Sequence, residues 1–197
     1  MPILPRLLQA PMAGVSTPAM AAAVSFNGGL GGVAAGHLNP EQAEKTLAET
    51  RERLGRSDFN VNLFCHRPAR VAPEVEGAWL SGLRPAFAEF DSSPPTALES
   101  PYKSLFEQPE MMRVLLGIKP RVVSFHFGLP EPEAVTALRE AGITLLASAT
   151  SLQEAKLAQE AGMHAVIAQG YEAGGHRGVF DPDGQDLRLS TAALTRL

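Results

Sequence analysis

The sequence predicts an α/β protein built on a parallel β-sheet, of the TIM (β/α)8-barrel type. Short apolar runs rich in branched residues alternate with helical patterns along most of the chain, which is typical of βα units. Two segments, REAGITLLASAT and QEAGMHAVIAQG, repeat the order of helix end, glycine (Gly142 or Gly162) and strand at a spacing of 20 residues. Because βα units this short favour a barrel, we expect that architecture.

Six short apolar runs bounded by turn residues are predicted as strands: 6–11, 30–36, 59–65, 121–127, 143–148 and 164–170. A complete barrel takes about 250 residues, whereas this chain has 197. We therefore expect residues 1–197 to form a partial barrel domain with about six of eight βα units, the last two being absent. The stretch 66–120 is roughly three times a normal crossover in length, which suggests an insertion or lid over the strand ends.

The first predicted helix follows the first strand. Ser16 or Thr17 can cap it, and Pro18 suits its first position. The segment GGLGGVAAG at 28–36 has the G-x-G-x-x-A spacing of a dinucleotide-binding loop. That fingerprint requires a strand before it and a helix after it, whereas here the helical pattern comes first. The segment is therefore predicted to be a helix-to-strand turn.

Two later helices carry start signals. Asn39 and Gln42 stand at the spacing of a capping box, in which each side chain bonds to the backbone of the other residue. Ser151 and Glu154 have the same spacing and predict a second capping box. These signals place helices after the second and fifth predicted strands.

Composition excludes several classes of function. The 17 basic and 21 acidic residues are spread along the chain and give a net charge of -4, so nucleic acid is not an expected partner. No stretch reaches the ~20 apolar residues that cross a membrane, and the N-terminus does not read as a signal peptide, which predicts a cytoplasmic protein. The single cysteine, Cys65, excludes an internal disulfide. It points away from its neighbour His66 on a strand, so a nucleophilic pair is not expected.

Candidate site residues follow the strands, since a parallel barrel carries its active site at their carboxyl ends. Pro11 and Met12 end the first predicted strand, where they form either an ordinary turn or a surface for a flat ligand. Asn60 and Asn62 point to one side of the third strand and need hydrogen-bond partners there. A polar ligand would supply those partners, as would neighbouring strands or water.

The strongest signal is AQGYEAGGHRGVF at 168–180, directly after the sixth predicted strand. Gly174 and Gly175 allow backbone conformations or a close ligand approach that a side chain would prevent. His176 can take a proton at neutral pH. No His, Asp or Glu lies near it at metal-ligand spacing, so a metal is not expected. His126, at the end of the fourth strand, either lines the same site or is a satisfied polar residue.

Four segments occur in this order: QAPMAGVSTPAMAAAVSFNGGLGG, NVNLFCHRP, VSFHFGLP and AQGYEAGGHRG. Together they resemble the successive motifs of the nitronate monooxygenases, formerly called 2-nitropropane dioxygenases, and in particular of the class that acts on propionate 3-nitronate. These are FMN-dependent barrels that oxidise alkyl nitronates with O2. The FMN-dependent enoyl-acyl-carrier-protein reductases carry a similar glycine-histidine segment, but VNLFCHRP and VSFHFGLP favour the monooxygenases.

The resemblance implies a role for each matching position. The positions that would contact FMN are the backbone around Pro11 and Met12, the side chains of Asn62 and Gln169, and Gly174. His176 matches the catalytic histidine, which would abstract a carbon-bound proton from a nitroalkane or support an already anionic nitronate. Tyr102 and His126 would line the pocket for the nitronate.

The ending departs from the family. Relatives continue into two further βα units whose glycine-rich loops hold the FMN phosphate, so this chain is expected to be a truncated fragment. An open six-stranded sheet would leave two edges exposed, which predicts self-association. Two alternatives stay open: a barrel similar to the enoyl-acyl-carrier-protein reductases, and a non-catalytic fragment that folds only with a partner.

Overall fold

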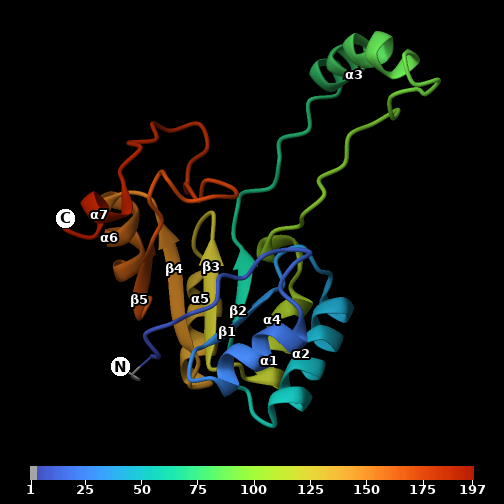
Figure 1. Cartoon of the computed structure of the whole chain (residues 1–197). Helices are drawn as coiled ribbons and strands as arrows, with labels where there is room; N and C mark the ends of the chain where they lie inside the picture. The colour runs from blue at the N-terminus through green and yellow to red at the C-terminus, as the bar shows by residue number, and fades with distance from the viewer. Residues whose placement is uncertain (1–3) are drawn as a thin grey trace. The chain divides into compact units, whose positions relative to one another are not determined.

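The structure is a computed structural model that describes residues 4–197. It contains a five-stranded parallel sheet in the order β1-β2-β3-β4-β5 (Figure 1). The strands are β1 Gly31–Ala34, β2 Phe59–Phe64, β3 Val122–His126, β4 Thr144–Ala149 and β5 Ala165–Ala168. The helices are α1 Pro18–Phe26, α2 Pro40–Leu54, α3 Pro73–Ala88, η1 Leu105–Glu107, α4 Glu110–Ile118, α5 Pro132–Glu140, α6 Leu152–Glu160 and α7 Thr191–Leu194.

Five of the six predicted strands are present, but residues 6–11 do not form a regular strand. They make a single parallel bridge, in which Leu8 pairs with Leu30 beside β1. Pro5 precedes the segment and Pro11 ends it, and a proline has no N–H to donate to a ladder. The bridge is therefore confined to the few residues between them.

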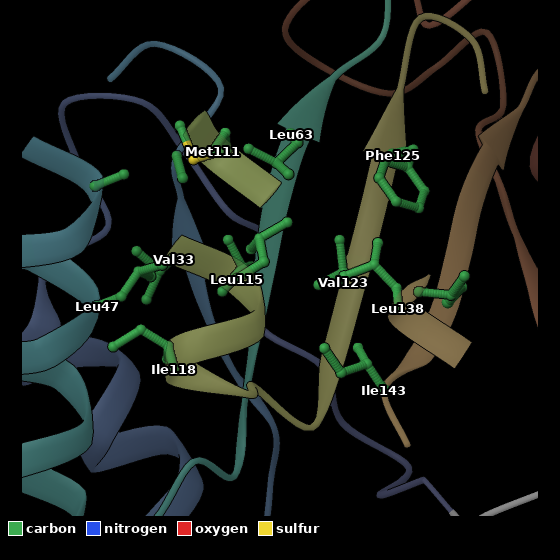
Figure 2. Packing of buried hydrophobic residues seen from close by; sticks show 14 of the residues in the cluster. Val33, Leu47, Leu63, Met111, Leu115, Ile118, Val123, Phe125, Leu138 and Ile143 are labelled. Carbon is green, nitrogen blue, oxygen red and sulfur yellow. The ribbon is translucent and has the colours of Figure 1, made fainter. Parts of the chain in front are cut away.

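Helices α2, α4, α5 and α6, which lie between successive strands, pack on one face of the sheet. Because each strand pairs with the next one along the chain, every crossover turns in the same direction, as in a barrel. Figure 2 shows the resulting core, in which strand residues Val33, Leu63, Val123 and Phe125 lie near the helix residues Leu47, Met111, Leu115 and Leu138. The α/β fold of barrel type predicted from the sequence is confirmed.

The other face of the sheet is more polar. Near the amino ends of the strands, Leu30, Val122 and Leu146 form a small apolar cluster against which Leu4 packs. Side chains further along the strands on this face include Asn62, which is half-buried. This face corresponds to the interior of a barrel.

The first helix and its flanking turns agree with the sequence signals. Thr17 caps α1 by accepting a hydrogen bond from Met20 N, and Pro18 is the first helical residue. The glycine-rich segment 28–36 joins α1 to β1, so the predicted helix-to-strand turn is confirmed. The segment is not a dinucleotide-binding loop.

One of the two predicted capping boxes is complete. Gln42 N donates to Asn39 Oδ1 at 2.9 Å, and Asn39 N donates to Gln42 Oε1 at 3.2 Å. At α6, Glu154 N donates to Ser151 Oγ at 3.1 Å, but the Glu154 carboxylate accepts from Thr150 N instead of Ser151 N. The predicted bond from Glu154 N to the Ser151 side chain is therefore present, but the predicted bond from Ser151 N to the Glu154 side chain is replaced by one from Thr150 N.

The chain divides into two compact units. One unit comprises the residues up to Arg67 together with Tyr102–Leu197, and it contains the whole sheet. The other is Pro68–Pro101, which contains α3. Leu80 is the buried residue of α3, whereas Trp79 is 57% exposed. Among residues 4–197, no helix has both the length and the apolar character needed to span a membrane.

Candidate active site

The predicted site residues His126 and Gln169 lie at the carboxyl ends of the parallel strands. His126 is the last residue of β3, and Gln169 directly follows β5. The loop that follows, residues 170–190, lies beyond the arrowheads of the strands (Figure 1). This end of the sheet is the one at which parallel barrels carry their chemistry.

Phe127 is the centre of an aromatic cluster at this end. Its backbone φ is +67°, which is uncommon for a residue with a Cβ and is found disproportionately at functional sites. The centroid of its ring lies 4.2 Å from that of His126. The His176 ring meets it edge-on, with centroids 6.1 Å apart and an interplanar angle of 90°. The strained turn after β3 thus brings both candidate histidines to one aromatic ring.

The two histidines have different environments. Burial lowers the pKa of His126, a hydrogen bond with the His176 backbone opposes that effect, and a positive charge on His176 lowers the pKa further. Protonation of His126 is therefore disfavoured at neutral pH. His176 is exposed. The arrangement offers one neutral imidazole as a hydrogen-bonding group and one accessible imidazole for proton transfer or charge stabilisation.

Gln169 binds the histidine loop through both ends of its side-chain amide. Its Nε2 donates to the carbonyl oxygen of His176 at 3.0 Å, and Gly178 N donates to its Oε1 at 2.7 Å. The side chain therefore spans the peptide groups on either side of Arg177. Its predicted contact with FMN remains a prediction.

Two glycines of the loop have opposite surroundings. A Cβ added at Gly178 would lie 2.4 Å from Cε1 of His126, so the loop backbone rests directly on that imidazole. A Cβ added at Gly174 would meet no described atom within 4 Å, and Gly174 is exposed. The first glycine is needed for packing against His126, and the second leaves open backbone beside His176.

The paired asparagines of β2 find a partner on the neighbouring strand. Asn60 Nδ2 and Asn62 Nδ2 donate to the hydroxyl oxygen of Ser124 on β3, at 2.9 and 3.0 Å. The sequence left a polar ligand, a neighbouring strand or water as possible partners of these two side chains. The neighbouring strand β3 supplies the acceptor for both amide groups. The Oδ1 atom of Asn60 is buried without a hydrogen-bond partner among the described residues. It is a polar atom of the inner face for which residues 4–197 provide no donor.

Pro11 and Met12 lie at the start of a tight turn. Pro11 packs against Gly32 of β1, where an added Cβ would come within 3.2 Å of Pro11 Cγ. Met12 N donates to Ser16 Oγ at 2.9 Å, and the Met12 carbonyl accepts from Val15 N and Ser16 N. Met12 is 44% exposed. The ordinary turn is present, and its exposed side chain leaves a ligand contact feasible.

Tyr102 joins the aromatic cluster through β2. Its ring meets Phe64 edge-on, with centroids 5.8 Å apart and an interplanar angle of 72°. The Phe64 ring in turn contacts Phe127 at 5.1 Å. Tyr102 and His126 are therefore linked through two phenyl rings in the same unit of the chain.

Cys65 is buried, and burial raises the pKa of its thiol. A thiol in that state is not a nucleophile, as the sequence indicated. Within residues 4–197, no group of three or more His, Cys, Asp or Glu side chains is arranged to hold a metal ion.

Sequence reasoning missed three charged residues around the histidine loop. Arg177 forms a bidentate ion pair with Asp186, and Glu154 Oε1 accepts from Phe180 N at 2.8 Å. The glycines of the loop suggest backbone flexibility, whereas the hydrogen bonds of these charged side chains restrain the backbone. The only sequence signal was the presence of ionisable residues in a loop otherwise rich in glycine.

Comparison with known sequences identifies relatives along nearly all of the chain. The sequence model of the family described as "Nitronate monooxygenase" matches residues 1–195. A protein of that name from Paraburkholderia phytofirmans is 54% identical over 191 residues, which cover 97% of this chain and 52% of that protein. Another from Pseudomonas aeruginosa is 52% identical over 193 residues, covering 97% and 54%. The chain spans about half the length of the curated relatives it matches.

Solved structures give the same picture. The nitroalkane oxidase from Streptomyces ansochromogenes superposes with a TM-score of 0.80 at 38% identity, covering 97% of this chain and 55% of that one. FabK from Thermotoga maritima gives a TM-score of 0.64 at 26% identity, covering 98% and 46%. Both share the fold of this chain over about half of their own length.

Proposed function

Because the chain belongs to the nitronate monooxygenase family, we propose that it carries the catalytic histidine of an FMN-dependent oxidation of alkyl nitronates or nitroalkanes by O2. Propionate 3-nitronate is the proposed substrate. The observation that carries the proposal is the placement of exposed His176 beside Phe127 and His126, at the carboxyl ends of the strands. The similarity to proteins named nitronate monooxygenase and nitroalkane oxidase supports it.

His176 acts differently on the two forms of substrate. A nitroalkane must lose a proton from carbon, and an exposed imidazole can accept that proton. A nitronate is already an anion, so a protonated His176 binds it electrostatically. Because His126 is disfavoured as a cation, it contributes a hydrogen bond but no second positive charge. The proposed roles thus differ: His176 meets the substrate, and His126 remains a neutral hydrogen-bonding group beside Phe127.

The residues present fit the flavin ring of a bound FMN. Asn62 is half-buried on the inner face, and its Nδ2 is bonded to Ser124, which leaves the amide oxygen to accept a hydrogen bond from a flavin N–H. The exposed turn at Met12 and the open backbone at Gly174 allow a flat ring to approach without a side chain in between. Pro11, Met12, Asn62, Gln169 and Gly174 are the proposed contacts. When bound, the flavin supplies the redox chemistry with O2.

The test combines flavin binding with turnover. We expect the chain to bind FMN, seen by quenching of flavin fluorescence, and His176→Ala to lower O2 consumption with propionate 3-nitronate by on the order of 10²-fold or more. His164→Asn is the control, because His164 precedes β5 at the opposite end of the sheet. Activity with reduced nicotinamide and an enoyl thioester, but none with nitronates, would favour the reductase alternative instead.

We also propose that the chain self-associates through β5. Its outer edge pairs with no other strand among residues 4–197, and Val166 and Ile167 are 38% and 39% exposed. An unpaired apolar edge strand favours pairing with another chain. A mass that rises with concentration in analytical ultracentrifugation, and that Ile167→Lys reduces, would support this interface. A monomer at all concentrations would exclude it.

A further inference from the structure

The loop that carries His176 is closed at its base. Tyr171 N donates to the Leu189 carbonyl at 2.7 Å. Thr191 N, at the start of α7, donates to a carboxylate oxygen of Glu172 at 2.9 Å. These two bonds bring the beginning and end of the loop together. They leave its middle, which contains His176, to be held by other groups.

Arg177, the residue after His176, makes three hydrogen bonds. Its Nε and Nη2 donate to the two carboxylate oxygens of Asp186, both at 2.9 Å. Its Nη1 donates to the carbonyl oxygen of Gln169 at 2.7 Å. The side chains of Arg177 and Asp186 are 21% and 26% exposed, so the pair is largely shielded from solvent. A bidentate pair of this kind fixes orientation as well as distance.

Glu154 connects the same segment to the sheet. One of its oxygens accepts from Phe180 N, and the other accepts from both the N–H and the hydroxyl of Thr150 at the end of β4. The carboxylates of Asp186, Glu154 and Glu172 all act on Arg177 and raise its pKa. The guanidinium is therefore the common counter-charge of three carboxylates around the loop.

We propose that Arg177 is a positioning residue for His176, held by Asp186 and by the Gln169 carbonyl. The inference rests on the proposed function for the role of His176 itself. The backbone on both sides of Arg177 is bound by the Gln169 amide, and its side chain is bound at three points, so the preceding Cα has little freedom. The His176 imidazole is left exposed on a fixed backbone. That is the arrangement that keeps a reacting group in place while allowing it to meet substrate.

The experiment compares Arg177→Ala with Arg188→Ala in the full 197-residue chain. Arg188 is the matched control, because it lies in the same loop and its side chain stacks over Tyr171 at 5.5 Å instead of binding the segment at 176–180. Hydrogen–deuterium exchange of peptides from 174–180, which exclude Tyr171, measures the loop around His176 directly. Steady-state oxidation of propionate 3-nitronate in the presence of FMN measures the consequence for His176.

We expect Arg177→Ala to raise exchange in 174–180 and to lower kcat by on the order of 10- to 100-fold with a small change in KM, because a shift of about 1 Å in a reacting group has effects of this size. Guanidinium ion at millimolar concentration should restore part of kcat, and tetramethylammonium should not. If Arg177 only stabilised the fold, recovery of kcat would not differ between these two cations.

Exchange in 174–180 that is unchanged, or raised equally by Arg188→Ala, would overturn the proposal whether or not the chain is active. Raised exchange with unchanged kcat would also overturn it, provided that His176→Ala abolishes turnover. If His176→Ala itself retains full turnover, the proposed function fails, while the exchange data still report whether Arg177 holds the loop.

Discussion

Gly178 is the position at which a single methyl group should disturb the site most directly. The loop backbone there rests on the His126 imidazole, and a Cβ at 178 would lie 2.4 Å from Cε1 and 2.9 Å from Nδ1 of that ring. The ring is itself held against Phe127, with centroids 4.2 Å apart. Neither partner can move without disturbing a further contact, so Gly178→Ala forces the loop away from the sheet.

The size of the effect follows from the distances. Ordinary contacts of a Cβ begin at 3.4 Å, so relief of the 2.4 Å approach needs a movement of about 1 Å. Inserting a methyl group into a closely packed site costs about 1–3 kcal/mol. For a chain of this size each kcal/mol corresponds to about 2–4 °C, which predicts a decrease in Tm of roughly 2–12 °C.

The assay is urea unfolding of Gly178→Ala followed by far-UV circular dichroism, with Gly174→Ala as the control. Gly174 lies in the same loop, has no described atom within 4 Å of its added Cβ and has no positive φ, so its substitution should change the free energy of unfolding by less than about 0.5 kcal/mol. Equal stability of the two variants would refute the packing of the loop on His126. A loss confined to Gly178→Ala would support it.

Three further predictions test other parts of the molecule. Phe125→Ala removes a fully buried side chain of the core and should lower the free energy of unfolding by about 3–5 kcal/mol in a denaturant titration. The ion pair of Asp186 with Arg177 holds the pKa of Asp186 at about 2, below the unfolded value of ~3.9. The stability that Asp186 contributes is therefore complete above about pH 4 and is lost as the pH falls towards 2, so the difference between the wild type and Asp186→Asn should shrink over that range. Cys65 should resist iodoacetamide at pH 8 in the native state and react once urea unfolds the chain, which mass spectrometry would detect.

The strands of the sheet could be predicted because burial on both faces leaves a mark in the sequence. All six residues of β4 are buried, and they read as a continuous run of small and apolar side chains. Residues 6–11 contain a similar apolar pair, Leu7 and Leu8, but pairing also needs N–H groups at the right positions, and Pro5 and Pro11 have none to donate. Local composition thus indicates which segments can form strands, whereas prolines at the ends of a segment limit how many of its residues pair with the next strand.

The sequence names candidate residues for the site but not the contacts between them. His176 is a candidate because of the glycines around it and its position after a strand. The role of Glu154 was misjudged because its spacing from Ser151 suggested a local cap, whereas its carboxylate bonds to Thr150 and Phe180. Phe180 is 26 residues away, and no local pattern reports such a contact. The pairing of Arg177 with Asp186 depends likewise on the closed loop.

The placement of the single tryptophan determines what intrinsic fluorescence can report. Trp79 is the only tryptophan of the chain and belongs to the unit Pro68–Pro101, whereas β1–β5 belong to the other unit. Because Trp79 is 57% exposed, its emission should already be shifted to long wavelength in the native state, and unfolding of α3 should change it little. Intrinsic fluorescence is therefore a weak probe of unfolding for this chain, and a tryptophan introduced at Phe64 would supply a signal from the unit that contains the sheet.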